Sequence, residues 1–394
     1  MTQEKDQHFM RQAYQAAIRA VGNSDPNPAV GAVVVSQDGE ILARGTTQRA
    51  GYAHAERHAL QQLTSRDLSA ATIYVTLEPC CHHGRTPPCV DAIAEKQLAR
   101  VVISERDFAA EVMGRSVQLL ESKGISVSLL EPENFDKEAW FTTDPFFFAR
   151  QYNRPRVTLK WAQTSDGALA PSVGPSGPIS GAQAAFMTAA LRNLHKCTLA
   201  TPGAVKHDAP RLTVRFGQFE QGFAYGGLSS FFSELIAAQV SGASMAQQGE
   251  QTQYKMPARA FLAAPQNPIE RGEFYARQTS LGGEFHTFAY LSAEWRGDFA
   301  GRMKFMLEEI NRKGYNSILI EAGPGFSELL LQHDLVDAVA VYRARGKTAH
   351  QLWGEPGRRN SFSAALDQGT PAGFELLEQA GFSEDDFYFF RRVR

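Results

Sequence analysis

The stretch TLEPCCHHGRTPPC, residues 76–89, holds three of the chain's four cysteines and two of its ten histidines. It follows the β-branched run TIYVT (72–76) and leads into PCVDAIAEK (88–96), which has the pattern of a helix. A loop this rich in soft ligand atoms predicts a metal site. The strand before it and the helix after it are the first sign of an α/β fold.

Runs of the same two kinds continue on both sides of this loop. Further strands are predicted at GAVVV (31–35) and RVVIS (100–104), and a further helix at HAERHALQQL (54–63). The segment SVQLLESKGISVSLLE (116–131) indicates a helix, a glycine stop and another strand. This alternation predicts a sheet covered by helices on both faces.

The length of 394 residues is too great for one ordinary core and predicts two α/β domains. We place the boundary at 147/148, which gives domains 1–147 and 148–394. This boundary lies within segment 132–155, which is rich in aromatic residues and interrupted by prolines. We expect its aromatic side chains to pack between the domains. A Gln-rich stretch, 242–253, is expected to be a mobile surface loop. The second domain is predicted to contain a helix near 181–195 and strands at 156–162, 197–201, 258–264, 316–322 and 337–343.

The composition excludes several classes of protein. A net charge of −2 provides no basic field for nucleic acid or an anionic membrane. The polar N-terminus lacks the apolar core of a signal peptide, and no apolar run approaches the roughly 18 residues of a membrane span. Crowded cysteines do not suggest a disulfide framework, so we expect a reducing, cytoplasmic location.

His54 and Glu56 form an H-x-E pair, and two Pro-Cys units place Cys80 and Cys89 after prolines. Cys89 is predicted to open the helix 88–96, where the partial positive charge of a helix start favours a thiolate. One imidazole and two thiolates suit Zn²⁺ and leave the fourth position for a water molecule. A bound Zn²⁺ lowers the pKa of that water to about 7. Glu56 is then placed to carry protons, as in zinc deaminases of bases.

Other interpretations of the same residues remain open at this point. The deaminase signature has two residues between its cysteines, whereas eight separate Cys80 from Cys89. Cys81 is an alternative ligand to Cys80, and the thiols would need no metal if they were simply buried. His83 is best explained as a solvated loop residue. A structural zinc module or a nucleic-acid deaminase would use similar residues, although the first has no need of Glu56 and the second needs a basic stripe.

DPNPAVGAVVV (25–35), HAER (54–57) and the 76–89 stretch together resemble the bifunctional pyrimidine deaminase/reductase of riboflavin biosynthesis. A long loop between the cysteines is normal in that family. The resemblance implies a cytidine-deaminase-like α/β/α sandwich with zinc on His54, Cys80 and Cys89, and with Glu56 as the proton carrier. It implies zinc-dependent deamination of a phosphoribosylated pyrimidine, followed by NADPH-dependent reduction of the ribosyl group to ribityl.

The resemblance also assigns contacts to the first substrate. Asn27 and His82 are implied to contact the pyrimidine, and Arg85 and Asp107 to help hold the ribose phosphate. A guanidinium suits phosphate oxygens. After Asp107 the family usually reads Pro-Asn-Pro, whereas this chain reads Phe-Ala-Ala at 108–110. A phosphate-side asparagine is therefore missing, and we expect the grip on the substrate to differ.

RPRVTLKWAQTSDGALA (154–170), HDAPRLTVR (207–215) and IEAGPGF (320–326) resemble the family's reductase domain, which has a dihydrofolate-reductase-like fold. The helix after Glu321 offers an N-terminus to which a phosphate can bind. Family members often form dimers or tetramers, and we expect a homo-oligomer with 337–343 as a candidate contact. The implied substrate-side residues are Ser176, Arg192, Leu212, Arg215 and Glu321, and the implied NADPH-side residues are Asp208, Gly323 and Pro324.

The cofactor side of this second domain departs from the family pattern. Pro178 replaces a tryptophan, Ala204 a threonine and Ala209 an aspartate, and Pro202 is expected to stiffen the loop at 200–205. Each change removes a group that would bond to or stack on a nucleotide. The alternative hypothesis is therefore a deaminase whose second domain binds a pyrimidine nucleotide but has lost NADPH chemistry and serves a specialised pathway.

Overall fold

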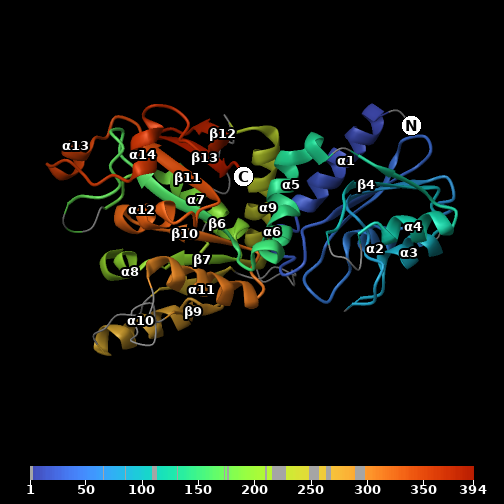
Figure 1. The fold of residues 1–394 in the computed structure, drawn as a ribbon, viewed down its shortest axis with the longest axis horizontal. Helices are drawn as coiled ribbons and strands as arrows, with labels where there is room; N and C mark the ends of the chain where they lie inside the picture. The colour runs from blue at the N-terminus through green and yellow to red at the C-terminus, as the bar shows by residue number, and fades with distance from the viewer. Residues whose placement is uncertain are drawn as a thin grey trace. The chain divides into compact units, whose positions relative to one another are not determined.

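The computed structural model describes residues 3–64, 66–84, 86–108, 113–130, 132–172, 174, 177–208, 211–214, 228–247, 257–262, 268–288 and 298–394. The described chain forms two compact units that divide between Gln151 and Tyr152. The predicted junction at 147/148 lies inside α6 (Asp144–Tyr152), a few residues before this division. Figure 1 shows the elements of both units.

The N-terminal unit is built on a five-stranded sheet with strand order β2-β1-β3-β4-β5. Its strands are β1 (Gly31–Val35), β2 (Ile41–Thr46), β3 (Thr72–Leu77), β4 (Arg100–Glu105) and β5 (Ser126–Leu129). Strand β1 is antiparallel to β2 and β3, whereas β3, β4 and β5 are parallel. The helices include α1 (Gln3–Ile18), α2 (Ala55–Leu60), α3 (Cys89–Glu95) and α4 (Arg115–Ser122).

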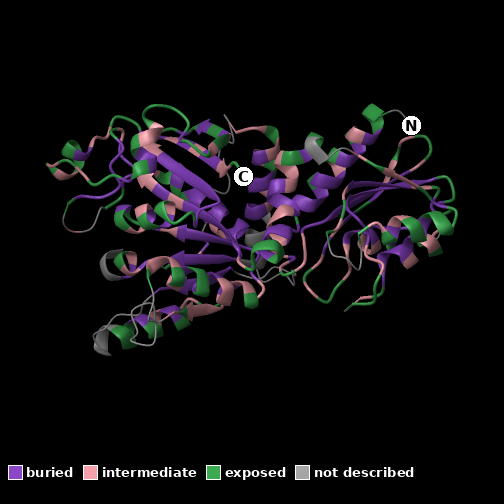
Figure 2. Cartoon of the chain, viewed as in Figure 1, coloured by how far each residue is buried: buried purple, intermediate pink, exposed green. Residues whose placement is uncertain are grey.

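The two faces of this sheet are both covered, because successive side chains of a strand point to opposite sides. On one face, Val33 and Tyr74 pack with Phe9 of α1. On the other, Val34 and Ile73 belong to a core cluster that includes side chains of α2, α3 and α4. The three central strands β1, β3 and β4 are accordingly buried along most of their length, whereas the edge strands β2 and β5 are partly exposed (Figure 2). This is the predicted α/β/α sandwich.

The aromatic segment at 132–155 is more regular than its prolines suggested. A 3-10 turn, η1 (Pro132–Phe135), is followed by α5 (Asp136–Thr142) and α6. Phe135 and Phe147 belong to core clusters of the N-terminal unit itself. For these two rings the expectation of packing between domains was wrong, because the helices fold back onto the sheet and bury them there.

Gly45 of β2 determines how closely α2 approaches the sheet. A Cβ at this position would lie 2.0 Å from the carbonyl oxygen of Ala55 and 2.5 Å from the nitrogen of Ala59. Only glycine allows this approach, since both obstructing atoms are backbone atoms. The helix that begins after His54 is therefore held directly against β2.

The C-terminal unit contains an eight-stranded sheet with strand order β12-β13-β11-β6-β10-β7-β8-β9. Six neighbouring strands run parallel to one another: β11, β6, β10, β7, β8 and β9. Strand β13 is antiparallel to both of its neighbours, β11 and β12. Its strands are β6 (Arg156–Gln163), β7 (Cys197–Ala200), β8 (Ala258–Phe261), β9 (Phe285–Thr287), β10 (Ser317–Glu321), β11 (Ala338–Ala344), β12 (Phe374–Gly381) and β13 (Asp385–Arg392). The described helices are α7 (Ala182–Leu194), α8 (Pro202–Asp208), α9 (Ser230–Gln247), α10 (Pro268–Ser280), α11 (Phe299–Arg312), α12 (Pro324–Gln332), α13 (Ala349–Trp353) and α14 (Ser361–Leu366).

Helices cover both faces of this second sheet as well. Met306 of α11 and Leu330 of α12 pack on one face with Leu159 of β6. On the opposite face, His195 at the end of α7 contacts Thr158 of β6, with Nε2 and Oγ1 2.7 Å apart. The predicted helix and all five predicted strands of this unit are present.

Two expectations about this unit were wrong. Residues 242–247 belong to α9 rather than to a loop, because alanine, methionine and glutamine are good helix formers, while 248–253 lie outside the described residues. Strand β11 is paired on both edges and buried, so it is not an exposed contact for a second copy. Among the helices that the structure describes, none combines the length and apolarity needed to cross a bilayer.

Candidate active site

The starts of two helices and the end of one strand bring three ligand residues together. His54 is the N-cap of α2, and Cys89 is the first residue of α3, after the N-cap Pro88. Cys80 follows β3 by three residues. The imidazole Nδ1 and the two sulfurs all lie within 4.8 Å of one another. The structure thus gathers the three residues that the sequence singled out for a metal.

The spacing of these donors fits zinc. The Nδ1 atom of His54 lies 3.5 Å from the Sγ atoms of both Cys80 and Cys89. Zinc bonds of about 2.0–2.1 Å to nitrogen and 2.3 Å to sulfur, at tetrahedral angles, place the two ligand atoms about 3.6 Å apart. Three donors of this kind leave one position open, which is the arrangement of a catalytic rather than a structural zinc site.

The electrostatics of the cluster favour a thiolate at Cys80 only. The hydrogen bond to Cys80 and burial raise the pKa of Cys89, so in the absence of a metal the expectation that the helix start favours a thiolate at Cys89 was wrong. The hydrogen bond donated by the Cys89 thiol lowers the pKa of Cys80 to about 4. The backbone N–H of Cys89 also donates to this sulfur, at 3.3 Å, as a helix start allows. A hydrogen bond with Cys80 is in turn the main cause that raises the pKa of His54.

Glu56 lies in the first turn of α2 and is only 3% exposed. Burial raises the pKa of its carboxyl, and the Cys89 thiol forms a hydrogen bond with it. Glu56 therefore lies beside the donor cluster without belonging to it. This is the position that a proton carrier needs.

The structure describes three of the four residues that the resemblance implies as substrate contacts of the deaminase. Asn27 is half-buried before β1, and its backbone N–H donates to the Ser24 carbonyl at 2.9 Å. His82 and His83 are both exposed on the loop between the cysteines. Arg85 lies outside the described residues.

Glu78 is a residue that sequence analysis missed. It is 4% exposed, and its Oε2 accepts hydrogen bonds from the backbone N–H groups of Asp107, at 3.4 Å, and Gly114, at 3.2 Å. It therefore fixes both ends of the segment that begins at the predicted phosphate-side Asp107. The available signal was an acidic residue directly before Pro79-Cys80, at the end of a buried strand.

In the C-terminal unit, Arg192 and Glu321 form a two-pronged ion pair. Arg192 donates from Nε to Oε1 at 2.6 Å and from Nη2 to Oε2 at 2.9 Å, and each side chain is 19% exposed. A third donor of Arg192 binds the carbonyl oxygen of Thr213 at 3.1 Å. Burial alone would raise the pKa of Glu321, but the guanidinium of Arg192 lowers it to about 2.

Lys160 and Tyr342 extend this pair into a polar cluster that sequence analysis missed. Lys160 lies opposite Glu321 in the register of β6 and β10, and burial lowers the pKa of its ammonium group. Its Nζ lies 5.3 Å from the centroid of the buried Tyr342 ring. The available signal was a lysine between Leu159 and Trp161 within the strand-like run RVTLKWA.

The start of α12 fits a phosphate-bearing cofactor. Gly323 is the N-cap of α12, no side chain caps it, and Pro324 follows at the helix start. The space beside the Cα atoms of Gly323 and Gly325 is open, so a ligand can approach the backbone closely. Unsatisfied N–H groups at a helix start bind anionic oxygens.

Other predictions for this unit had mixed outcomes. Pro202 begins helix α8 and does not lie in a stiffened loop, since proline is well tolerated in the first turn of a helix. Residues 211–214 belong to no helix or strand, and Leu212 is buried with a left-handed φ of 51°. Ser176, Arg215 and Ala209 lie outside the described residues. Asp208 is the last residue of α8.

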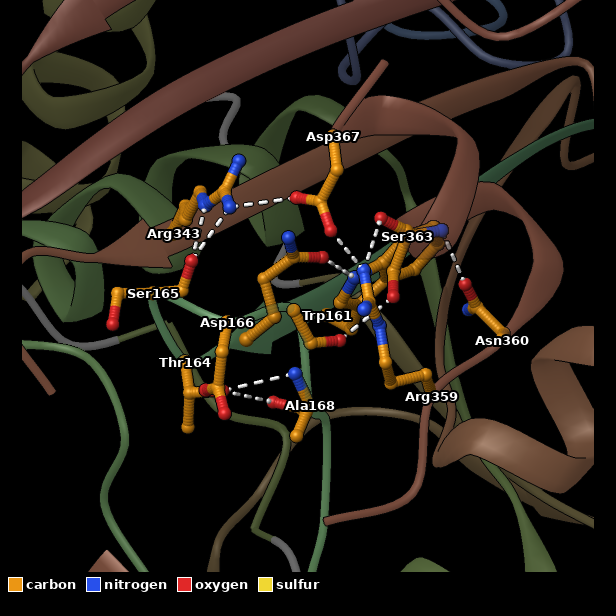
Figure 3. A network of polar contacts seen from close by, with 12 residues as sticks. Trp161, Thr164, Ser165, Asp166, Ala168, Arg343, Arg359, Asn360, Ser363 and Asp367 are labelled. Atoms are coloured by element: carbon orange, nitrogen blue, oxygen red, sulfur yellow. Dashed lines mark hydrogen bonds and ion pairs between the residues drawn. The ribbon is translucent and has the colours of Figure 1, made fainter. Parts of the chain in front are cut away.

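A polar network fixes the turn that follows β6. Figure 3 shows Arg343 donating to the carbonyl oxygen of Ser165, at 2.6 Å, and to Asp367, also at 2.6 Å. Arg359 binds the same Asp367 carboxylate from the other side. The turn at 164–168 is thus connected to the end of α14, so the C-terminal end of β6 is held in one place.

Comparison with known proteins identifies the family. Residues 3–105 match the cytidine and deoxycytidylate deaminase zinc-binding region, and residues 155–225 match the RibD C-terminal domain. The riboflavin biosynthesis protein RibD of Escherichia coli is 33% identical over 347 residues, which are 86% of this chain and 88% of that protein. The chain belongs to the RibD family. The RibD of Aquifex aeolicus is 41% identical over 216 residues, covering 55% of this chain and 59% of that protein.

Two solved structures extend the likeness to the fold of the whole chain. A diaminohydroxyphosphoribosylaminopyrimidine deaminase/5-amino-6-(5-phosphoribosylamino)uracil reductase from Thermotoga maritima is 26% identical, with a TM-score of 0.74 and 99% coverage of both chains. RibD of Acinetobacter baumannii is 25% identical, with a TM-score of 0.72 and the same coverage.

These likenesses confirm the main sequence-based predictions. The chain has a deaminase-like N-terminal domain and a RibD reductase C-terminal domain of dihydrofolate-reductase-like fold. It is an enzyme of riboflavin biosynthesis that combines a zinc hydrolase with a reductase, and its cofactors are Zn²⁺ and NADPH.

Proposed function

We propose that the N-terminal domain deaminates 2,5-diamino-6-(5-phosphoribosylamino)pyrimidin-4-one, replacing an amino group by an oxygen from water and releasing ammonia. The observation that carries this proposal is the convergence of His54, Cys80 and Cys89 beside the buried Glu56. A pyrimidine-type substrate is supported by the family and by the deaminase region.

Each residue of this site has a separate role in the proposal. His54, Cys80 and Cys89 hold Zn²⁺, which when bound polarises and acidifies a water molecule. Glu56 takes a proton from that water and returns it to the leaving amino group. Its burial keeps bulk water from exchanging with the proton in transit. Asn27 and His82 orient the pyrimidine, and Arg85 and Asp107 hold the ribose phosphate.

The C-terminal domain is proposed to reduce the ribosyl group of the deaminated product to ribityl. NADPH supplies the hydride when bound. Gly323 and Pro324 at the start of α12, with Asp208, are the proposed contacts for this cofactor. The proposed substrate contacts are Ser176, Arg192, Leu212, Arg215 and Glu321. The Arg192–Glu321 pair supports this placement, because it lies at the C-terminal end of β10, directly before the helix that would bind the phosphate.

The deaminase proposal is tested by Glu56→Gln, with zinc content and products measured together by metal analysis and mass spectrometry. We expect deamination to be lost and zinc to be retained. The exposed Glu121→Gln serves as the matched control. Unchanged deamination in Glu56→Gln would contradict the assigned role and favour a structural zinc module.

The reductase proposal is tested by following NADPH absorbance after the deaminated intermediate is added. We expect NADPH to be oxidised, with a raised KM, because Pro178 and Ala204 lack the stacking and hydrogen-bonding groups that the family supplies. Ala204→Thr should lower that KM about tenfold, the effect of one regained hydrogen bond of about 1.4 kcal/mol. Deamination without any NADPH oxidation would support the deaminase-only alternative.

We further propose a homo-oligomer, a dimer or a tetramer, that works in the reducing cytoplasm with domains at 1–147 and 148–394. None of the four cysteines forms a disulfide, which supports the reducing location. The net charge of −2 argues against a nucleic-acid substrate.

A further inference from the structure

A hollow of about 530 Å³ opens beside the segment that begins at Asp107. The residues that line it are Asp107, Phe108, Phe147, Arg150 and Gln151, all of the N-terminal unit. The sequence pointed to Asp107 and to the departure from the family pattern at Phe108, but not to Phe147, Arg150 or Gln151, and none of the five belongs to the cluster of proposed zinc ligands. The hollow combines an aromatic wall, a carboxylate and a guanidinium.

The aromatic wall is unusually exposed. Phe108 is 72% exposed, and its ring packs edge-to-face on the buried Phe147, with centroids 4.9 Å apart. Burying a phenylalanine side chain contributes about 1.5–3 kcal/mol, so a ligand that packs on this ring would gain binding free energy. Phe108 stands where the family usually has a proline, so this wall distinguishes the chain from its relatives.

Arg150 of α6 provides the positive charge. Its guanidinium lies over the ring of Phe146, with Cζ 4.8 Å from the centroid, and it is exposed. Among the residues that the structure describes, no carboxylate forms an ion pair with it. The ring holds the guanidinium in place, while its N–H donors remain available to an anion.

Glu78 connects this hollow to the metal cluster. Its carboxylate accepts the backbone N–H of Asp107, and it lies two residues before Cys80 in the same extended segment. Ser116 strengthens the connection by donating from Oγ to the carbonyl oxygen of Pro79 at 2.6 Å. The hollow is therefore connected, through the hydrogen bond between Glu78 and Asp107, to the segment that carries the proposed zinc ligand Cys80.

We propose that this hollow binds the phosphorylated ribose of the deaminase substrate, with Arg150 as a phosphate partner and Phe108 as the wall against the sugar. The proposal rests on the deaminase function proposed above. A phosphate monoester carries a charge of about −1.5 to −2 at neutral pH and needs more than one cation. Arg150 thereby compensates for the asparagine that is Ala109 in this chain, while the Asp107 carboxylate accepts hydrogen bonds from sugar hydroxyls.

The test compares the phosphorylated substrate with its dephosphorylated analogue. For each protein the selectivity is the ratio of the two kcat/KM values. We expect Arg150→Gln to lower this selectivity roughly 10- to 100-fold through KM, as the loss of a charged hydrogen bond predicts. Arg150→Lys should restore most of it. Arg19→Gln, at an exposed arginine beyond the end of α1, is the matched control and should change nothing.

A second measurement uses ribose 5-phosphate as a competing ligand. It should inhibit the native enzyme and inhibit Arg150→Gln at least tenfold less strongly. Unchanged selectivity in a zinc-loaded, active Arg150→Gln would overturn the inference and leave the proposed deaminase intact. If the zinc-loaded native chain deaminates neither compound, the proposed function itself fails, and the inference fails with it.

Discussion

Glu105 at the end of β4 should make the stability of the N-terminal unit depend on pH between about 4.5 and 7. Its Oε1 accepts a hydrogen bond from Tyr14 at 3.0 Å, and its Oε2 accepts one from Thr143 at 2.7 Å. Burial is the main cause that raises the pKa of this carboxyl from 4.5 to about 7. The folded state therefore binds the proton more tightly than the unfolded state.

The sign and the size follow from this difference. Stability from the protonated form is fully present below pH 4.5 and is lost as the pH rises through 7. Linkage between pKa values of 4.5 and 7 gives a loss of about 3 kcal/mol in all, of which about 2.5 kcal/mol falls between pH 5 and pH 8. Glu105→Gln removes the ionisable group. The hydroxyl of Tyr14 lies 3.0 Å from Oγ of Ser104 and can donate its proton there, which leaves the Tyr14 oxygen free to accept a hydrogen bond from the new amide.

The assay is urea unfolding of the native chain and of Glu105→Gln at pH 5 and pH 8. Amide hydrogen exchange of β4, read by mass spectrometry, reports on the N-terminal unit separately. The variant should gain about 2.5 kcal/mol relative to the native chain between the two pH values, and the exposed Glu121→Gln should gain nothing. An equal pH dependence in the native chain and Glu105→Gln would refute the reasoning.

Three further perturbations have definite expected outcomes. Gly45→Ala should cost about 1–3 kcal/mol and reduce the zinc content, because the new Cβ meets the Ala55 carbonyl oxygen; full metal loading at native stability would contradict this. Glu321→Ala should cost about 3–5 kcal/mol by leaving the guanidinium of Arg192 unpaired, and replacing both residues with methionine should recover most of that loss in urea unfolding. Burial lowers the pKa of His195 to about 4, so the stability of the native chain is present above pH 6.5 and is lost as the pH falls toward 4. His195→Gln should remove this loss. If the free energy of unfolding of the native chain were the same at pH 6.5 and pH 4, and His195→Gln did not change it, this cause would be excluded.

Much of the fold and of the metal cluster could be predicted from local patterns in the sequence. The strands at GAVVV and TIYVT are β-branched runs that no helix would favour, and they are present as β1 and β3. The three proposed zinc ligands were recognisable because zinc accepts few side chains, and two Pro-Cys units with an H-x-E pair are uncommon. That His54 lies close in space to Cys80 and Cys89, which come 26 and 35 positions later in the sequence, had to be inferred.

The remaining features depend on tertiary packing. Nothing near Glu78 in the sequence indicates that it holds the N–H groups of Asp107 and Gly114, because these lie 29 and 36 positions away. The pairing of Arg192 with Glu321, 129 positions apart, is equally invisible to local patterns. Arg192 on its own has the appearance of a solvated surface cation.

The assignment of the zinc ligands is tested most directly by the metal content of cysteine variants. Plasma emission spectrometry on purified protein would count zinc ions per chain in the native protein and in Cys80→Ser, Cys81→Ser and Cys89→Ser. We predict one zinc per chain in the native protein and in Cys81→Ser, and a large loss in the other two. Zinc retained by Cys80→Ser, or lost from Cys81→Ser, would contradict the site on which the whole account of this enzyme depends.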